Sequence, residues 1–201
     1  MFEFAGPLNG LIDQLRKIPG VGAKTAQRMA FHIIAMSEEE AFSLAESIRQ
    51  VKSRIFTCSR CNAITDVDPC AICSDPTRSD EVLCVVEEAF DIAAIEKTGV
   101  FHGRYYVLTG TLSPLKGRGP DELGLDRLAD RVASSPVKEV IIATNPTVEG
   151  EATAVLIMKA LSRFGIKISR IAMGLPVGSD IDYADQVTMR KALEGRTEMK
   201  E

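Results

Sequence analysis

The sequence predicts a multi-part α+β chain: a helical N-terminal region, a small cysteine-rich module, an α/β domain with a mostly parallel sheet, and a short helical C-terminal tail. Three patterns lead to this prediction. Apolar residues recur at helical spacing in the first 54 residues, and cysteines cluster between Cys58 and Cys73. From residue 80 onward, apolar runs alternate with amphipathic stretches, as in parallel strands joined by helices. The predicted boundaries are 1–54, 55–77, 80–175 and 176–201.

Three helices are predicted in the N-terminal region. The first, over 8–17, has an apolar face formed by Leu8, Leu11, Ile12 and Leu15. A second helix over 25–36 follows a glycine-containing turn. Ser37, followed three residues later by Glu40, forms a capping box that begins a third helix over 38–54.

The α/β region alternates predicted strands and helices. Strands are expected over 81–88, 104–110, 138–145 and 167–176. Helices are expected over 89–99, 123–132 and 149–165, and one more, over 182–196, forms the tail. Such alternation predicts parallel strands with helices covering both faces of the sheet.

The cysteines predict a metal centre. Cys58, Cys61, Cys70 and Cys73 form two CxxC pairs separated by eight residues. In a reducing compartment this clustering indicates metal ligation rather than a disulfide framework. Four thiolates close a tetrahedral zinc site with no open position, so we expect one structural Zn²⁺ per chain and no catalytic metal there. The fifth cysteine, Cys84, falls within a predicted strand and is expected in the core.

The turn Ile18-Pro19-Gly20-Val21-Gly22 between the first two helices resembles a helix-hairpin-helix motif. Its glycines allow the backbone to approach a phosphate, and the next helix begins with unpaired N–H groups. Basic side chains lie before the turn and on one face of the second helix. We expect non-sequence-specific contacts with single- and double-stranded DNA through Lys17, Gly20, Gly22, Lys24 and Arg28. A plain helical hairpin with a glycine turn is the alternative.

Acidic residues follow two of the predicted strands. Glu87 ends the first, and Glu149-Gly150-Glu151 follows the third. This pair resembles the Toprim fold of type IA topoisomerases and bacterial primases. Asn145 and Thr147 occupy the two aspartate positions of that family's second motif, so a Mg²⁺ site for phosphoryl transfer is not expected. A weak cation site at the three glutamates, or simple capping of the helix by Glu149 and Glu151, stays open.

Composition sets further limits. The net charge is −4, with eight Lys and Arg against six Asp and Glu in residues 1–60 and 16 against 22 in the rest. DNA contact is therefore expected in the N-terminal third. No apolar run approaches the roughly 20 residues of a membrane span, and the first residues lack the pattern of a secretory signal. We expect a cytoplasmic, nucleoid-associated protein with no membrane partner.

In combination, the hairpin, the four-cysteine finger, the Toprim-like domain and the tail resemble the RecR family of bacterial recombination mediators. The resemblance covers nearly the whole chain. It implies a protein without known catalytic activity that acts in recombinational DNA repair. Its partners would be RecO and RecF, with which it would place RecA on single-stranded DNA coated by single-strand-binding protein. The loop Lys116-Gly117-Arg118-Gly119-Pro120 is more basic than the family's usual pattern.

The resemblance also implies a ring-like tetramer assembled through the terminal regions, with the hairpins facing its opening. A closed ring, most simply a dimer of dimers, would multiply the few phosphate contacts of one hairpin. The N-terminal helices and the 182–196 helix are the expected interfaces. An acidic rim is the expected docking site for RecO, formed by Glu87, Asp91, Glu149 and Glu151.

Two other functions compete with DNA-binding mediation. One is a zinc-stabilised scaffold that binds protein only, in which Lys24 and Arg28 form a solvated helix face. The other is a Mg²⁺-dependent nuclease or primase-like enzyme, which Asn145 and Thr147 argue against.

Overall fold

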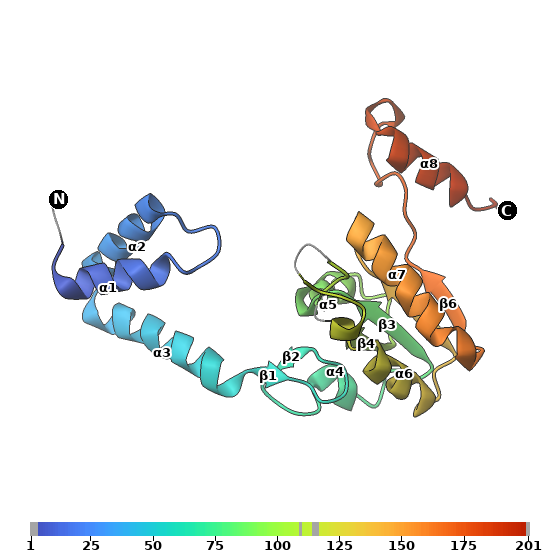
Figure 1. The fold of residues 1–201 in the computed structure, drawn as a ribbon, viewed down its shortest axis with the longest axis horizontal. Coiled ribbons are helices and arrows are strands. Elements are labelled where there is room, and N and C mark those ends of the chain that lie inside the picture. Colours follow the sequence, from blue (N-terminus) through green and yellow to red (C-terminus); the bar gives the residue numbers. More distant parts are fainter. Residues whose placement is uncertain (1–3, 109, 114–116, 200–201) are drawn as a thin grey trace. The chain divides into compact units, whose positions relative to one another are not determined.

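The computed structural model describes residues 4–108, 110–113 and 117–199. The chain divides into two compact units, Met1–Ile55 and Phe56–Glu201 (Figure 1). Lys116 of the basic loop lies outside the described residues. Within the described ranges, no helix combines the length and the apolar character needed to cross a membrane.

The N-terminal unit contains the three predicted helices, α1 (Gly6–Leu15), α2 (Ala23–Ala35) and α3 (Glu38–Arg54). Helices α1 and α2 pack together around a small buried core of Ile12, Ala26 and Ala30. The small alanine side chains let the two helices approach closely. The apolar face predicted for the first helix is confirmed, because its leucines border this core.

The capping box that begins α3 is confirmed. The Glu40 N–H donates to Ser37 Oγ at 3.2 Å, and the Ser37 N–H donates to Glu40 Oε2 at 3.0 Å. Two N–H groups of the first turn thereby gain acceptors within the chain. The N–H and hydroxyl of Ser37 also lower the pKa of the Glu40 carboxyl.

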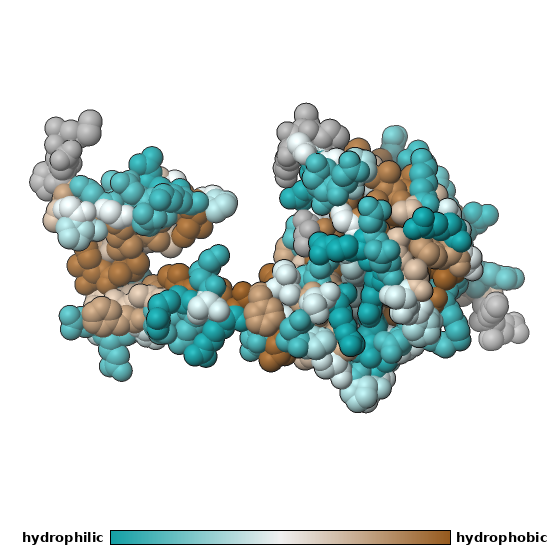
Figure 2. Space-filling view, turned by 60° about the horizontal axis from the view of Figure 1, so that its bottom comes forward, coloured by the Kyte–Doolittle hydropathy of each residue, from teal (hydrophilic) through white to brown (hydrophobic). Residues whose placement is uncertain are grey.

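Helix α3 has no buried residue. Its apolar side chains are 41 to 67% exposed: Phe42, Leu44, Ile48 and Val51. Figure 2 shows apolar surface, in brown, gathered on this unit. These apolar side chains gain little from burial within their own chain, so this surface is suited to contact with another molecule.

The second unit begins with the cysteine-rich module. It consists of an antiparallel pair of two-residue strands, β1 (Phe56–Thr57) and β2 (Ile64–Thr65), followed by the short helix α4 (Ala71–Ser74). The sequence predicted only an irregular segment here, because elements this short leave no periodic pattern.

A parallel sheet of four strands forms the rest of this unit, in the order β4-β3-β5-β6. Its strands are β3 (Val82–Val86), β4 (Arg104–Val107), β5 (Glu139–Ala143) and β6 (Lys167–Arg170). The strand predicted over 167–176 is therefore shorter than expected. Strand β6 lies at the edge of the sheet and pairs only with β5, which itself ends at Ala143.

Helices connect successive strands of this sheet, and a further helix follows the last strand. They are α5 (Ala89–Glu96), α6 (Leu125–Ala133), α7 (Val148–Leu161) and α8 (Gln186–Glu194). Short 3₁₀ segments occupy Asp121–Leu123, Ser162–Phe164 and Ile181–Tyr183.

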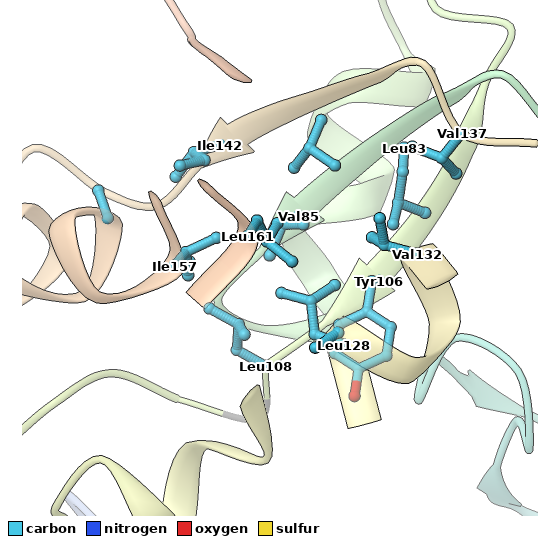
Figure 3. Close-up of a cluster of buried hydrophobic side chains, with 13 residues drawn as sticks. Leu83, Val85, Tyr106, Leu108, Leu128, Val132, Val137, Ile142, Ile157 and Leu161 are labelled. Atoms are coloured by element: carbon cyan, nitrogen blue, oxygen red, sulfur yellow. The ribbon is translucent and has the colours of Figure 1, made fainter. Parts of the chain in front are cut away.

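Alternate residues of β3, β4 and β5 enter two different cores, as expected for a sheet covered on both faces. Leu83 and Val85 pack with residues of α6 and α7, among them Leu128 and Ile157 (Figure 3). Cys84 and Val86 face the other way and pack with α5 and the four cysteines of the module. Burial raises the pKa of the Cys84 thiol to about 12, and the expected core position of this residue is confirmed.

Candidate zinc centre and nucleic-acid interface

Four cysteine thiols converge in the small module. All four residues are buried, and their sulfur atoms lie within 4.8 Å of one another. The Sγ atoms of Cys61 and Cys70 are 3.6 Å apart. Sulfurs at the corners of a tetrahedron with Zn–S bonds of about 2.3 Å would be roughly 3.8 Å apart. The donor set and its spacing therefore fit a closed tetrahedral zinc site made by Cys58, Cys61, Cys70 and Cys73.

Two local backbone turns bring these thiols together. In the first, Asn62 adopts a left-handed φ of 60°, and the Cys58 N–H donates to Ala63 O at 2.8 Å. In the second, Cys70 immediately precedes α4, which carries Cys73. The Cys70 N–H donates to Cys58 Sγ at 3.4 Å and so links the two turns.

Hydrogen bonding among the thiols shifts the pKa values of Cys61 and Cys73 in opposite directions. The pKa of the Cys73 thiol is lowered to about 6, mainly because the Cys61 thiol donates a hydrogen bond to it. The same hydrogen bond, together with burial, raises the pKa of Cys61. A bound dication would hold all four groups as thiolates and release their protons.

The cysteine module is attached to the sheet by specific contacts. The Val107 N–H donates to Cys61 O at 2.8 Å, and Asn62 Nδ2 donates to Val107 O at 3.0 Å. The four cysteines also share a hydrophobic cluster with residues of β3, β4 and α5. Metal binding should therefore stabilise the adjoining sheet as well as the module.

The hairpin turn joins α1 to α2 in the N-terminal unit. Gly20 has a φ of +81°, which residues with a side chain rarely adopt, and the Val21 N–H donates to Ile18 O at 3.0 Å. Gly22 is the N-cap of α2, and no side chain caps the first N–H groups of that helix. Apart from the residues next to each glycine in the chain, no described atom lies within 4 Å of the position of a Cβ at Gly20 or Gly22. This backbone is open to an anion.

Basic side chains surround this turn. Lys17, Lys24 and Arg28 are all exposed, and the last two lie one helical turn apart on the same face of α2. Lys17 Nζ donates to Gln14 Oε1 at 3.0 Å. Neither Lys24 nor Arg28 forms an ion pair with any described residue. The hairpin thus brings together all the residues for which DNA contact is predicted.

At the acidic edge of the sheet, where β3 and β5 end, Glu87 is more buried than the sequence analysis expects. Glu87 is expected on a rim facing a partner, yet it is only 7% exposed. Its Oε1 accepts from the Asn145 N–H at 2.8 Å, and its Oε2 accepts from Asn145 Nδ2 at 2.6 Å. Both residues follow neighbouring strands, β3 and β5, so their proximity results from the parallel pairing. Asn145, which the sequence marks only as a missing acid, is the donor that satisfies Glu87.

The other unusual positions of this motif also have structural roles. Thr147 is the N-cap of α7, where its Oγ1 accepts from the Gly150 N–H at 3.0 Å. A Cβ at Gly150 would lie 2.0 Å from Asn145 O and 2.8 Å from Glu87 Oε1, so only glycine fits there. The loop after β5 is therefore held by neutral donors around one buried carboxylate.

Sequence reasoning missed Arg170, the last residue of β6. Its Nη2 lies 2.5 Å from Glu151 Oε1, and its Nη1 donates to Thr144 Oγ1 at 2.7 Å. The guanidinium group thus neutralises Glu151 next to the loop after β5, in which Asn145 donates to Glu87. No local motif marks this arginine, because its partners belong to other parts of the chain.

The two remaining acids differ in exposure. Glu149 is exposed in the first turn of α7. Asp91 is partly buried, and its Oδ2 accepts from the Glu88 N–H at 2.9 Å to cap α5. In the described part of the chain, the cysteines form the one cluster of three or more potential metal-binding groups.

These features define a class of protein: a zinc-stabilised chain that joins a helical hairpin to a parallel, Toprim-type α/β domain. Comparison with known families assigns every part. Residues 8–52 match the RecR helix-hairpin-helix model, 55–75 the RecR four-cysteine zinc finger domain, 81–172 the Toprim domain, and 174–197 the RecR C-terminal model. The chain belongs to the RecR family of recombination proteins, and its four cysteines form the family's structural zinc site, one per chain.

Full-length relatives agree with this assignment. The chain is 56% identical to recombination protein RecR of Koribacter versatilis over 99% of its own length and 100% of the relative's. It is 51% identical to that of Heliobacterium modesticaldum, again over 99% and 100% of the two chains. The RecR of Carboxydothermus hydrogenoformans is 54% identical over 96% and 97%.

Proposed function

We propose that this protein is a DNA-binding recombination mediator that acts with RecO and RecF to load RecA onto single-stranded DNA coated by single-strand-binding protein. One observation carries the DNA-binding part. The hairpin presents an open backbone turn, an uncapped helix N-terminus and two cations without a described ion-pair partner, Lys24 and Arg28, on one surface. Such a surface contacts phosphates rather than base edges, so binding is independent of sequence. This function would place the protein in the cytoplasm with the nucleoid.

The test is the double variant Lys24→Gln/Arg28→Gln, measured by fluorescence anisotropy with several single-stranded and duplex oligonucleotides. Affinity should fall similarly for all sequences, and the slope of log K against log salt should flatten by roughly one unit per lost contact. Lys52→Gln/Arg54→Gln is the matched control, because it removes two exposed cations from the same unit. Unchanged affinity and slope in the hairpin variant would instead support a scaffold that binds protein only.

The acidic edge of the sheet is the proposed docking site for RecO. Glu87 is buried, and both of its carboxylate oxygens accept hydrogen bonds from Asn145, so its proposed role is to position the loop after β5. The acids around it would then make the contact with RecO. Glu149 is exposed, whereas Asp91 and Glu151 already have internal partners that a docking protein would share. Calorimetry with purified RecO should show weaker binding by Glu149→Gln. Unchanged binding would remove this edge from the proposed contact.

We expect no phosphoryl transfer. Glu87 already accepts a hydrogen bond from Asn145, and Glu151 already pairs with Arg170, so Mg²⁺ would have to displace these donors. The site also lacks the two aspartates of the Toprim motif, which would bind the ion. Metal-dependent cleavage or primer synthesis that disappears in Glu87→Gln would overturn this expectation.

The proposed assembly is a closed tetrameric ring. The apolar side chains of α3, and Val187 and Leu193 of α8, are exposed in a single chain and are suited to contact with other copies. Light scattering should give a mass near four times 21.8 kDa. Val187→Ser/Leu193→Ser should lower that mass and weaken DNA binding together, because several hairpins would no longer act on one strand. A monomer that binds DNA tightly would exclude the ring.

A further inference from the structure

A cavity of about 610 Å³ lies between the cysteine module and helix α6. Its lining is unusually basic, because three arginines contribute to it: Arg60, Arg127 and Arg131. Asp130 is the one acid among the described lining residues. The charged groups of the cavity therefore sum to a net positive charge, in a unit that carries most of the chain's negative charge.

Tertiary structure fixes these arginines in place. Arg60 lies inside the first CxxC turn, which is attached to β4 through the hydrogen bonds of Cys61 and Asn62 with Val107. Arg127 and Arg131 are one turn apart on α6, so they share a face of that helix. The opposite face of α6 is anchored in the core by Leu128, Ala129 and Val132. Two segments distant in sequence thus supply one group of cations.

None of these three guanidinium groups forms an ion pair with a described residue. Three other arginines of the same unit do pair with carboxylates, namely Arg78, Arg104 and Arg170. In addition, the Nε atom of Arg131 is buried without a hydrogen-bond partner among the described residues. Cations that line a cavity without ion-pair partners create a local positive potential, which a bound anion would relieve.

The zinc thiolates account for only part of this charge. Arg131 is close enough to contribute, as a minor cause, to the lowered pKa of Cys73. Arg60 acts in a similar way on Asp68, whose pKa is lowered mainly by hydrogen bonds from Ser59 and only in minor part by this guanidinium group. Arg60 and Arg127 are exposed on the lining and form no ion pair with a described residue, so both can bind an external ligand.

We propose that this cavity binds phosphate groups and that a single DNA strand supplies them. Guanidinium groups bind phosphate through paired hydrogen bonds, and Arg is favoured over Lys where such forked contacts are made. A flexible single strand can bend its phosphates into a concave site of this size, whereas a duplex, with a persistence length of about 50 nm, is too stiff to follow the lining. Zinc would act as a positioning element, because it holds the turn that carries Arg60. The identity of the strand as DNA rests on the proposed function, but phosphate binding by the cavity does not.

Pyrophosphate is the probe for the cavity itself, measured by calorimetry on the zinc-loaded full chain. The wild type should bind it, and Arg60→Gln/Arg127→Gln should weaken that binding at least tenfold with the zinc content unchanged. Lys97→Gln/Lys159→Gln is the charge-matched control, because it removes two exposed cations of the same unit outside the cavity, and it should bind like the wild type. Failure of the wild type to bind, or equal losses in both variants, would overturn the proposal.

Displacement identifies the source of the phosphate. A short oligothymidylate should displace pyrophosphate from Lys24→Gln/Arg28→Gln, a background in which the hairpin cations are absent. A duplex of equal length should not. Displacement by an oligoglutamate peptide, with none by the oligothymidylate, would show that an acidic protein segment is the ligand and would overturn the proposed DNA strand. If Lys24→Gln/Arg28→Gln loses all DNA binding while Arg60→Gln/Arg127→Gln binds DNA like the wild type, the proposed function stands and the proposed DNA strand in the cavity is overturned.

Discussion

Replacing Asn145 with aspartate tests how the loop after β5 is held. The substitution changes one amide into a carboxylate at almost constant volume, directly against the buried Glu87. Two effects destabilise the variant. The 2.6 Å hydrogen bond from Nδ2 to Glu87 Oε2 is lost, and hydrogen bonds to charged groups contribute about 1.5–3 kcal/mol. Two carboxylates are then placed against each other, at about 4 kcal/mol for a 4 Å separation near a protein surface. Since Asn145 is exposed to solvent, screening reduces the second effect.

We therefore expect Asn145→Asp to lower the free energy of unfolding by about 2–4 kcal/mol at pH 7. Urea denaturation followed by circular dichroism measures it. The loss should shrink as the pH falls, because one of two adjacent carboxyl groups then takes up a proton that it can donate to the other.

The double variant Glu87→Gln/Asn145→Asp is the control, because it reverses donor and acceptor: the new amide can donate to the new carboxylate. It should recover most of the lost stability. Equal stability of Asn145→Asp and the wild type at pH 7, or no recovery in the double variant, would refute this account of the loop.

Three other predictions follow from the contacts described. Cys61→Ser should abolish stoichiometric zinc, measured by elemental analysis, and lower the thermal midpoint; an unchanged midpoint would contradict a structural metal. Gly150→Ala should destabilise by about 3 kcal/mol in urea titration, because its Cβ would meet backbone, whereas Gly10→Ala has open space and should not. Arg78 lowers the pKa of Glu96, so their pair stabilises above about pH 4.3 and is lost as pH falls. Glu96→Gln should therefore flatten the acid limb of a stability–pH profile.

The sequence alone predicted the features that depend on neighbours along the chain. The spacing of Cys58, Cys61, Cys70 and Cys73 indicated a zinc centre, because two short turns suffice to converge four thiols. The capping box at Ser37 and the glycine turn at Gly20 were also predicted, since each depends on backbone geometry within a few residues. Apolar periodicity predicted the helices and the parallel sheet. Two-residue strands and the early end of β6 were missed, because periodicity does not report where a neighbouring strand stops.

Only the tertiary structure determines which polar side chains that lie far apart in the sequence contact one another. Glu87 and Asn145 are 58 residues apart, yet the parallel pairing of β3 with β5 makes them partners and buries an acid expected at the surface. Arg170 reaches Glu151 from an edge strand, and Arg60 meets the arginines of α6 only because the cysteine module is attached to β4. Side-chain partners across a sheet depend on strand order and register. Those are set by the packing of the whole domain, and no local pattern encodes them.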